Sequence, residues 1–216
     1  MKEEIPYNPL DKRNLGISVE KALLERPVCP LPPNEKFIGA GIYAIYYVGE
    51  YGPYKKISDR NKNGRFELPI YVGKAVPKGA RKGGFGLGIS PGTVLFSRLK
   101  QHANSIKEVD LNISDFYCRY LIVDDIWIPL GESLLIEMYT PIWNKVMDGF
   151  GIHTPGKGRE NQQKSLWDMT HPGRKLASKL PDNTKTKEKI LANLKLFLSG
   201  EKAEVIDSLK ATLEDE

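Results

Sequence analysis

The sequence predicts an α+β protein with a small core, in which helices flank a three-stranded sheet that is mixed or antiparallel. Strand-like segments, dense in β-branched and aromatic residues, cover residues 41–48, 68–73 and 116–123. Apolar residues recur at helical spacing over residues 93–107 and 133–139. The predicted order of elements in the core is therefore β-β-α-β-α.

We expect the 216 residues to form a single domain with additions to its core. Residues 1–36 are predicted to be an N-terminal arm, with a short helix over residues 19–24 that a proline cluster ends. The core is expected over residues 37–149, and residues 150–216 are expected to be a C-terminal extension.

The two first strands are predicted to pair antiparallel. Residues 49–66 between them are polar and rich in turn formers, which favours a long loop or an elaborated hairpin connection, and insertions of this length are usually functional. A second insertion, near residues 77–92, holds a glycine-rich basic stretch without the Lys-Ser/Thr ending of a phosphate-binding loop. It either follows a phosphate backbone or is a flexible linker.

Helix signals frame the rest of the core. Thr93 is a candidate N-cap for the first core helix, and Pro141 stops the second, which is expected over residues 133–139. After a glycine-rich loop at residues 148–159, two amphipathic helices are predicted. One ends at Gly200, and the other carries Val205, Ile206, Leu209 and Leu213 on one face.

Composition is that of an ordinary globular protein, with 40% hydrophobic and 27% charged residues. The formal charge is +5, and residues 1–200 carry +9 because the last sixteen residues have a balance of −4. This excess is compatible with a polyanionic partner such as nucleic acid, although scattered lysines give the same balance.

No apolar run approaches the roughly 18 residues that cross a bilayer, and the first residues lack the apolar stretch of a signal peptide. We therefore expect a cytoplasmic protein without membrane contact. Cys29 and Cys118 have neither metal-binding nor disulfide-framework spacing, and we interpret them as buried or incidental thiols.

Several side chains are candidates for chemistry. Two phenols on neighbouring strands of a basic protein, Tyr43 and Tyr71, suggest a reaction at phosphate, although aromatic residues favour strands in any case. Arg98 and His102 are four residues apart and so share a helix face. Glu132 is expected at a helix start, where the helix dipole favours a carboxylate even without a ligand.

Taken together these residues resemble the GIY-YIG nuclease superfamily. The series runs, in the order of the family and within residues 37–149, through Gly41-Ile42-Tyr43, Tyr71-Val72-Gly73, Arg98-x-x-x-His102, Glu132-x-x-Leu135-Ile136 and Pro141-x-Trp143-Asn144. Val72 stands where the family name has isoleucine, and the 49–66 insertion is not part of the general pattern. Residues 68–77, 148–159 and 171–174 look like the branch of type II restriction endonucleases associated with the palindrome CCGCGG.

The resemblance implies a nuclease that uses Mg²⁺ or Mn²⁺, without an organic cofactor, to hydrolyse double-stranded DNA by an attacking water. It assigns Tyr43 as the base, and Tyr71 then contacts the phosphate or orders the water. Glu132 is the implied anchor of the metal ion, Arg98 the fork that holds the scissile phosphate, and Asn144 an orienting residue.

Two points of chemistry qualify these roles. A free phenol is only about 0.1% ionised at pH 7, a deficit of roughly 4 kcal/mol, so we expect Lys74 to favour the phenolate or His102 to accept its proton. Glu137 is a rival metal ligand, but it lies about 140° around the helix from Glu132, so the two carboxylates do not easily share an ion.

Sequence specificity has to come from outside this centre, because a phosphate backbone is common to all DNA. The basic residues of the insertions are candidates for contacts with DNA; they are Arg60, Arg65, Arg81, Lys82, Lys157 and Arg159. A palindromic site is mirrored by two-fold protein symmetry, so we expect a homodimer on DNA.

Two alternatives remain open from the sequence. One is a repair, homing or structure-specific nuclease with the same core, although no separate DNA-binding domain is evident. The other is a DNA-binding module without catalysis, which the presence of every expected catalytic side chain disfavours.

Overall fold

The structure, a computed structural model, describes residues 6–77, 90–152 and 162–206, and these form an α+β fold as predicted. In chain order the elements are α1 (Lys12–Leu24), β1 (Cys29–Pro30), β2 (Gly41–Tyr47), η1 (Gly52–Tyr54), α2 (Lys55–Asn61), β3 (Tyr71–Ala75), α3 (Val94–Lys107), η3 (Ile113–Asp115), β4 (Phe116–Ile122), η4 (Asp125–Trp127), α4 (Ile128–Tyr139), α5 (Ile142–Lys145), α6 (Leu166–Thr170) and α7 (Lys187–Ser199).

The described strands form one antiparallel sheet with the order β1-β4-β2-β3. The predicted antiparallel pairing of β2 with β3 is confirmed, and it sets Tyr43 opposite Gly73. The prediction of three strands is wrong, because the sheet has four. The added strand, β1, spans two residues within the proline cluster, too short a segment to show a period of two.

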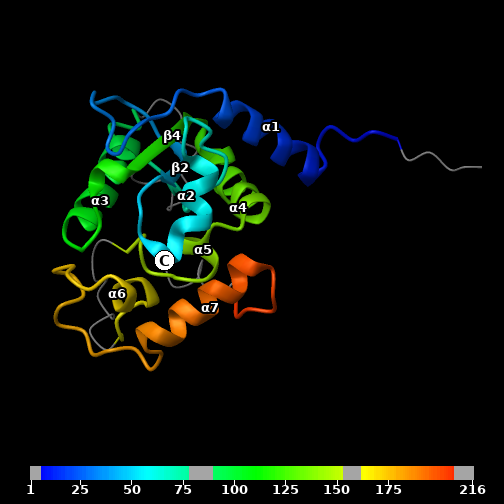
Figure 1. Ribbon diagram of the computed structural model, residues 1–216. Coiled ribbons are helices and arrows are strands. Elements are labelled where there is room, and N and C mark those ends of the chain that lie inside the picture. Colours follow the sequence, from blue (N-terminus) through cyan, green and yellow to red (C-terminus); the bar gives the residue numbers. More distant parts are fainter. Residues whose placement is uncertain (1–5, 78–89, 153–161, 207–216) are drawn as a thin grey trace, which may run out of the picture.

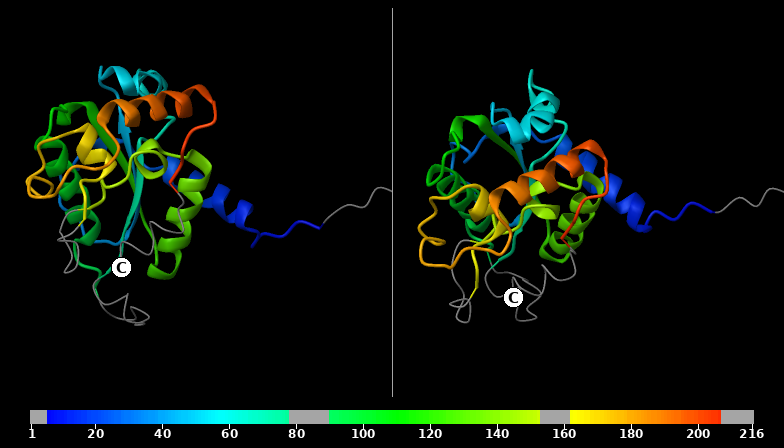
Figure 2. Two further views of the ribbon diagram at one scale, coloured as in Figure 1. Left: turned by 90° about the horizontal axis from the view of Figure 1, so that it is seen from below. Right: turned by 60° about the horizontal axis from the view of Figure 1, so that its bottom comes forward.

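Helices cover both faces of this sheet, with α3 on one side and α4 and α1 on the other (Figures 1 and 2). Strand β2 is consequently buried along its whole length. Alternation along the strand turns Tyr43, Ile45 and Tyr47 toward the α3 face, and Ile42, Ala44 and Tyr46 toward the α4 face. The two faces thus hold two separate apolar clusters.

The segment before β2 contributes to the fold beyond its predicted short helix. Helix α1 begins at Lys12, where the Asp11 side chain accepts a hydrogen bond from the Arg13 main-chain N–H. Near its other end, Leu23 is buried in the apolar cluster on the α4 face of the sheet. Tyr139 on α4 donates a hydrogen bond to Glu20 at 2.5 Å. Packing against α4 therefore extends the helix over seven residues that the sequence pattern did not include.

The 49–66 insertion is not the loop that its composition suggests, because it contains η1 and α2. Tyr54 and Ile57 are buried in the α3-face cluster, and this burial favours the helical turns. Asn61 closes the insertion: its side-chain nitrogen donates to the carbonyls of Tyr47 and Leu68, and its side-chain oxygen accepts from the Leu68 N–H.

Two details of the core helices also differ from the prediction. Helix α4 begins at Ile128, not near residue 133, and Pro129 occupies its first turn, where its fixed φ angle suits a helix start. Glu132 consequently lies in the second turn, away from the end of the helix dipole. Thr93 precedes α3, but its side chain makes no capping hydrogen bond.

The C-terminal extension packs at the end of the sheet where β2 ends, with α6 and α7 close together (Figure 1). Helix α7 ends at Gly200 in a left-handed conformation with φ of 79°, as the glycine predicts. The second predicted tail helix is wrong for Val205 and Ile206, which lie outside any helix. The Ile206 N–H donates instead to the Lys145 carbonyl at 2.7 Å. The remaining residues of that predicted helix lie outside the described ranges.

Within those ranges, the structure contains no helix with the length and apolar character that a bilayer crossing requires.

Candidate active site

The two motif tyrosines lie on the α3 face of the sheet, Tyr43 in β2 and Tyr71 in β3, with ring centroids 6.3 Å apart. The ring of Tyr43 extends over Gly73 on the neighbouring strand, and a Cβ atom at position 73 would lie 2.4 Å from the Tyr43 hydroxyl. Strand β3 therefore requires a glycine here, because any larger residue displaces the phenol.

Replacing Gly73 by alanine is expected to reduce the free energy of unfolding by about 1–3 kcal/mol, the usual cost of overpacking a core. Gly52→Ala is the matched control, because a Cβ atom there meets nothing within 4 Å. Urea unfolding of both variants measures the difference. Equal stability of Gly73→Ala and Gly52→Ala would show that Tyr43 does not depend on this glycine.

Helix α3 brings Arg98 and His102 to the tyrosines. Leu95, Leu99 and Ile106 anchor the helix in the α3-face cluster, and this fixes which of its sides faces the sheet. His102 is fully buried, and its Nε2 lies 2.5 Å from the hydroxyl of Tyr43, which is also fully buried. The i, i+4 spacing places Arg98 one turn earlier on the same side, where it is half-buried.

Burial raises the pKa of the Tyr43 phenol above its ordinary value, and the charge and hydrogen bond of Arg98 oppose this rise. A hydrogen bond with Tyr71 also lowers the pKa, whereas the negative charge of Glu132 raises it. The phenol is therefore protonated at neutral pH. It acts as a base only if its proton passes to a partner, and His102 is within hydrogen-bonding distance.

A short segment after α5, residues 149–152, closes over these side chains. Arg98 Nη2 donates to the Gly151 carbonyl at 2.9 Å. The ring of Phe150 stacks on His102, with centroids 4.6 Å apart and planes at 20°, and meets Tyr71 edge to face at 5.0 Å. The sequence indicated a glycine-rich loop here that resembles the restriction-endonuclease branch, but it assigned Phe150 no role; the aromatic residue between two glycines was the available signal.

Lys74 of β3 and Glu132 of α4 meet on the α4 side of the sheet. Alternation along β3 turns Val72 and Lys74 away from the face that carries Tyr71. Lys74 Nζ lies 2.7 Å from Glu132 Oε2, with side chains 31% and 16% exposed. Lys74 is thus paired with a carboxylate, and Arg98 is the cation that lowers the pKa of Tyr43.

Glu132 is the carboxylate of this centre that suits a divalent metal ion. Within the described residues, no three His, Cys, Asp or Glu side chains gather into a metal site. Mg²⁺ does not need such a group, since it retains waters and binds through one or two carboxylates together with substrate phosphates. The chemistry of this donor set therefore fits Mg²⁺. Glu137, the rival ligand, is exposed elsewhere on α4.

Asn144 joins α5 to the edge strand. Its side-chain oxygen accepts from the Val72 N–H and its side-chain nitrogen donates to the Val72 carbonyl, both at 2.9 Å. The amide thus satisfies the main chain of β3 beside Tyr71, as a neighbouring strand would. A single side chain that fills both ladder positions fixes the strand that carries the second tyrosine.

Of the basic candidates in the insertions, the structure describes Arg60 and Arg65. Arg60 pairs with Glu67 at 2.7 Å, and Arg65 donates to the main-chain carbonyls of Asp59 and Lys62. Both follow the end of β2 that is remote from Gly41. Arg81, Lys82, Lys157 and Arg159 lie outside the described residues.

A second buried tyrosine–histidine pair, missed by sequence reasoning, connects the 49–66 insertion to the C-terminal extension. His171 Nε2 lies 2.5 Å from the Tyr54 hydroxyl, which also accepts a hydrogen bond from Trp143 Nε1 at 3.0 Å. Burial lowers the pKa of His171 from 6.5 to about 4, although Asp110, 3.4 Å from Nδ1, opposes this shift. His171 is therefore neutral at pH 7.

This histidine should make stability depend on pH. Because its pKa is lower in the folded than in the unfolded state, its contribution is complete above pH 6.5 and is lost as the pH falls toward 4. The shift corresponds to about 3 kcal/mol. Between pH 7 and pH 4, the wild type should lose about that much more unfolding free energy than His171→Gln does. Parallel pH profiles in urea unfolding would contradict this assignment.

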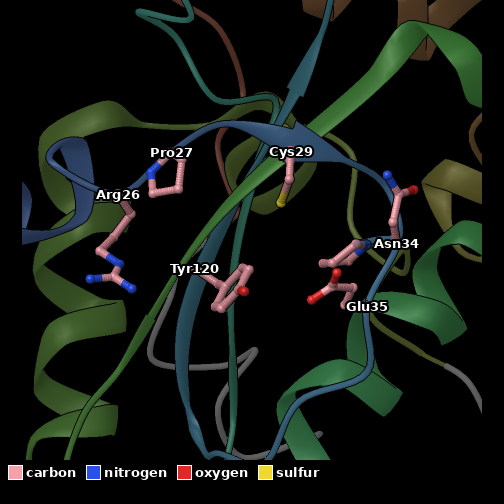
Figure 3. Close-up of a pocket in the computed structure, with 7 residues that line it drawn as sticks. Arg26, Pro27, Cys29, Asn34, Glu35 and Tyr120 are labelled. Atoms are coloured by element: carbon pink, nitrogen blue, oxygen red, sulfur yellow. The ribbon is translucent and has the colours of Figure 1, made fainter.

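A pocket near β1 lies on the face of the sheet that carries Tyr43 and Tyr71, but neither tyrosine lines it (Figure 3). Its lining residues are Arg26, Pro27, Cys29, Pro33, Asn34, Glu35 and Tyr120. Cys29 and Cys118 face each other across β1 and β4, with sulfur atoms 3.6 Å apart, and both are free thiols. Cys118 is buried as expected, whereas Cys29 is only half-buried.

Comparison with known proteins gives this centre its context. Residues 35–198 match the family described as the Eco29kI GIY-YIG domain, and this span contains both tyrosines, α3, Glu132, Asn144 and the 149–152 segment. No curated protein matches the chain. The matched span covers most of the sequence, so the chain belongs to the Eco29kI GIY-YIG family of restriction-endonuclease-type nucleases, which are hydrolases that act on DNA.

Proposed function

We propose that the protein is a type II restriction endonuclease, which uses Mg²⁺ to hydrolyse both strands of DNA at a palindromic GC-rich site, with CCGCGG as the first candidate. The observation that carries the proposal is the 2.5 Å contact between the Tyr43 hydroxyl and His102 Nε2, beside Arg98 and Tyr71, in a chain of this family. Such a group can remove a proton from water next to a bound phosphate.

Proton transfer begins at the more exposed phenol. Tyr71 is 9% exposed and hydrogen-bonded to Tyr43, whereas Tyr43 has no exposed surface. Tyr71 therefore orders the attacking water, takes a proton from it and gives its own hydroxyl proton to Tyr43. Tyr43 in turn gives its proton to His102 Nε2. For this step His102 must carry its resting proton on Nδ1. The relay avoids a free phenolate, which the raised pKa of Tyr43 makes costly.

Arg98 acts on the phosphate. Its guanidinium, fixed by the Gly151 carbonyl at 2.9 Å, is half-buried next to the phenols. A planar fork of N–H donors matches two phosphate oxygens and stabilises the charge that develops on them. The same positive charge lowers the pKa of Tyr43, so the residue also assists the base.

Glu132 would hold the Mg²⁺ ion, which when bound supplies positive charge for the phosphate and the leaving oxygen. Lys74, 2.7 Å from Glu132, orients this carboxylate. Asn144 holds β3, so that Lys74 and Tyr71 keep their places on opposite faces of one strand.

Sequence recognition is proposed to come from the segments that carry Arg81, Lys82, Lys157 and Arg159. The chain enters the first of these from β3 and the second from residues 149–152, both parts of the centre. Arg60 and Arg65 are held by acidic and main-chain partners at the other end of β2. A palindromic target is read by two copies related by two-fold symmetry, so a homodimer on DNA is part of the proposal.

The proposal is tested with two plasmids that differ in one base pair, one with a single CCGCGG and one with that site altered. With Mg²⁺, the first should become linear and the second should stay supercoiled, and a chelator should prevent cleavage. Equal nicking of both plasmids, or no cleavage, would refute the specific function. Preferential cleavage of a branched duplex would favour a structure-specific nuclease instead.

A further inference from the structure

Residues 149–152, which contact the catalytic candidates, accept hydrogen bonds from Arg174 of the C-terminal extension. Arg174 is 2% exposed. Its Nη1 donates to the carbonyls of Phe150 and Ile152 at 3.3 and 2.9 Å, and its Nη2 donates to the carbonyl of Gly149 at 2.8 Å. One side chain thus binds three main-chain carbonyls of the segment.

Asp168 fixes the orientation of this guanidinium. Arg174 Nε donates to Asp168 Oδ1 at 2.7 Å, and Nη2 donates to Oδ2 at 2.8 Å. Asp168 is 5% exposed and accepts a further hydrogen bond from the Ser165 hydroxyl at 2.7 Å. The five contacts use the five N–H donors of an arginine, and a lysine has only three donors.

The segment passes this constraint to the catalytic candidates. Its Gly151 carbonyl accepts from Arg98, and its Phe150 ring contacts the rings of both His102 and Tyr71. A Cβ atom at position 151 would lie 2.6 Å from the Tyr71 hydroxyl, which shows how closely the segment covers that phenol.

The turn before Arg174 rests on the end of the helix that carries Arg98 and His102. Gly173 has φ of 137°, and a Cβ atom there would come within 2.3 Å of the Glu108 carbonyl, the C-cap of α3. The Lys175 N–H donates to the Glu108 side chain at 3.0 Å. The turn therefore sets the position of the 149–152 segment relative to α3.

We propose that Arg174, oriented by Asp168, is a positioning residue for DNA cleavage: it fixes the 149–152 segment, which in turn places Arg98, His102 and Tyr71. The proposal rests on the nuclease function proposed above. Arg174 itself does not contact the reacting phosphate, and it acts on turnover rather than on DNA affinity.

The test uses the full chain with Arg174→Lys, which keeps the charge opposite Asp168 but lacks the fork. Under single-turnover conditions with Mg²⁺, cleavage should slow by about 100-fold, the typical effect of misplacing catalytic groups by about 1 Å. The dissociation constant for the same DNA, measured with Ca²⁺, should stay within about threefold of the wild type. Deuterium uptake in a peptide that covers residues 149–152 should rise.

His171→Gln is the matched control, because it changes a buried contact of the same turn, with Tyr54, and leaves the contacts of Arg174 in place. It should cleave at close to the wild-type rate. Asp168→Asn should shift cleavage and deuterium uptake in the same direction as Arg174→Lys, because its amide nitrogen cannot accept one of the two hydrogen bonds that Asp168 accepts from Arg174. The shift should be smaller, because the arginine keeps its donors for the main-chain carbonyls.

Each outcome decides the matter. Wild-type cleavage by a folded Arg174→Lys, an equal loss in His171→Gln, or a loss of DNA affinity in place of rate would overturn the positioning role. Unchanged deuterium uptake over residues 149–152 would also overturn it, whatever the cleavage result. A wild-type protein that cuts no DNA would instead refute the proposed function, and the exchange measurement would still report on the contacts of Arg174.

Discussion

Tyr43→Phe is expected to slow DNA cleavage by about 10³-fold while DNA binding is retained, because it removes the hydroxyl that passes a proton to His102. The buried imidazole loses its 2.5 Å partner, so the free energy of unfolding should also fall by about 1–3 kcal/mol. Single-turnover cleavage and urea unfolding measure the two effects separately.

Tyr46→Phe is the control for this prediction. Tyr46 lies three residues along the same strand, is 1% exposed, and has a hydroxyl bonded to Arg119 at 3.1 Å, but it faces α4. Its loss should reduce stability by a similar amount and leave cleavage close to wild type. If Tyr43→Phe cleaved as fast as Tyr46→Phe, the phenol would have no part in the chemistry.

Glu132→Gln is expected to reduce Mg²⁺-dependent cleavage by about 10³-fold or more, because the variant loses the charge that would hold the ion. The amide is nearly isosteric, and the ion pair with Lys74 is partly exposed, so stability should change by at most about 1 kcal/mol. Titration with Mn²⁺ in the absence of DNA should show weaker binding than in the wild type.

Glu137→Gln provides the comparison, since Glu137 is an exposed carboxylate on the same helix. It should keep both metal binding and cleavage. The opposite result, in which Glu137→Gln loses metal binding and Glu132→Gln does not, would move the metal site along α4.

Local periodicity explains how much of this centre the sequence predicted. A period of two in β2 and β3, together with antiparallel pairing, brings Tyr43 and Tyr71 to one face of the sheet. The i, i+4 spacing on α3 places Arg98 and His102 together. Such relations depend on a few neighbouring residues, so they are readable without the fold.

Long-range contacts account for what the sequence did not predict. Arg174 binds main-chain carbonyls up to 25 residues earlier, and a carbonyl acceptor has no side-chain signature. The Tyr54–His171 pair joins positions 117 residues apart. Tyr54 lies in η1, a short helix in a segment whose composition predicted a loop. Predicting the Lys74–Glu132 ion pair would have required the correct start of α4 at Ile128. Pro129 was the signal in the sequence for that start.

The proposed function requires that this chain cuts duplex DNA at one sequence. Digestion of a bacterial genome with the protein and Mg²⁺, followed by sequencing of all fragment ends, tests it most directly. Every pair of ends should map to one palindromic GC-rich sequence, with both strands cut at fixed positions. Ends distributed over unrelated sequences, or intact DNA, would contradict it.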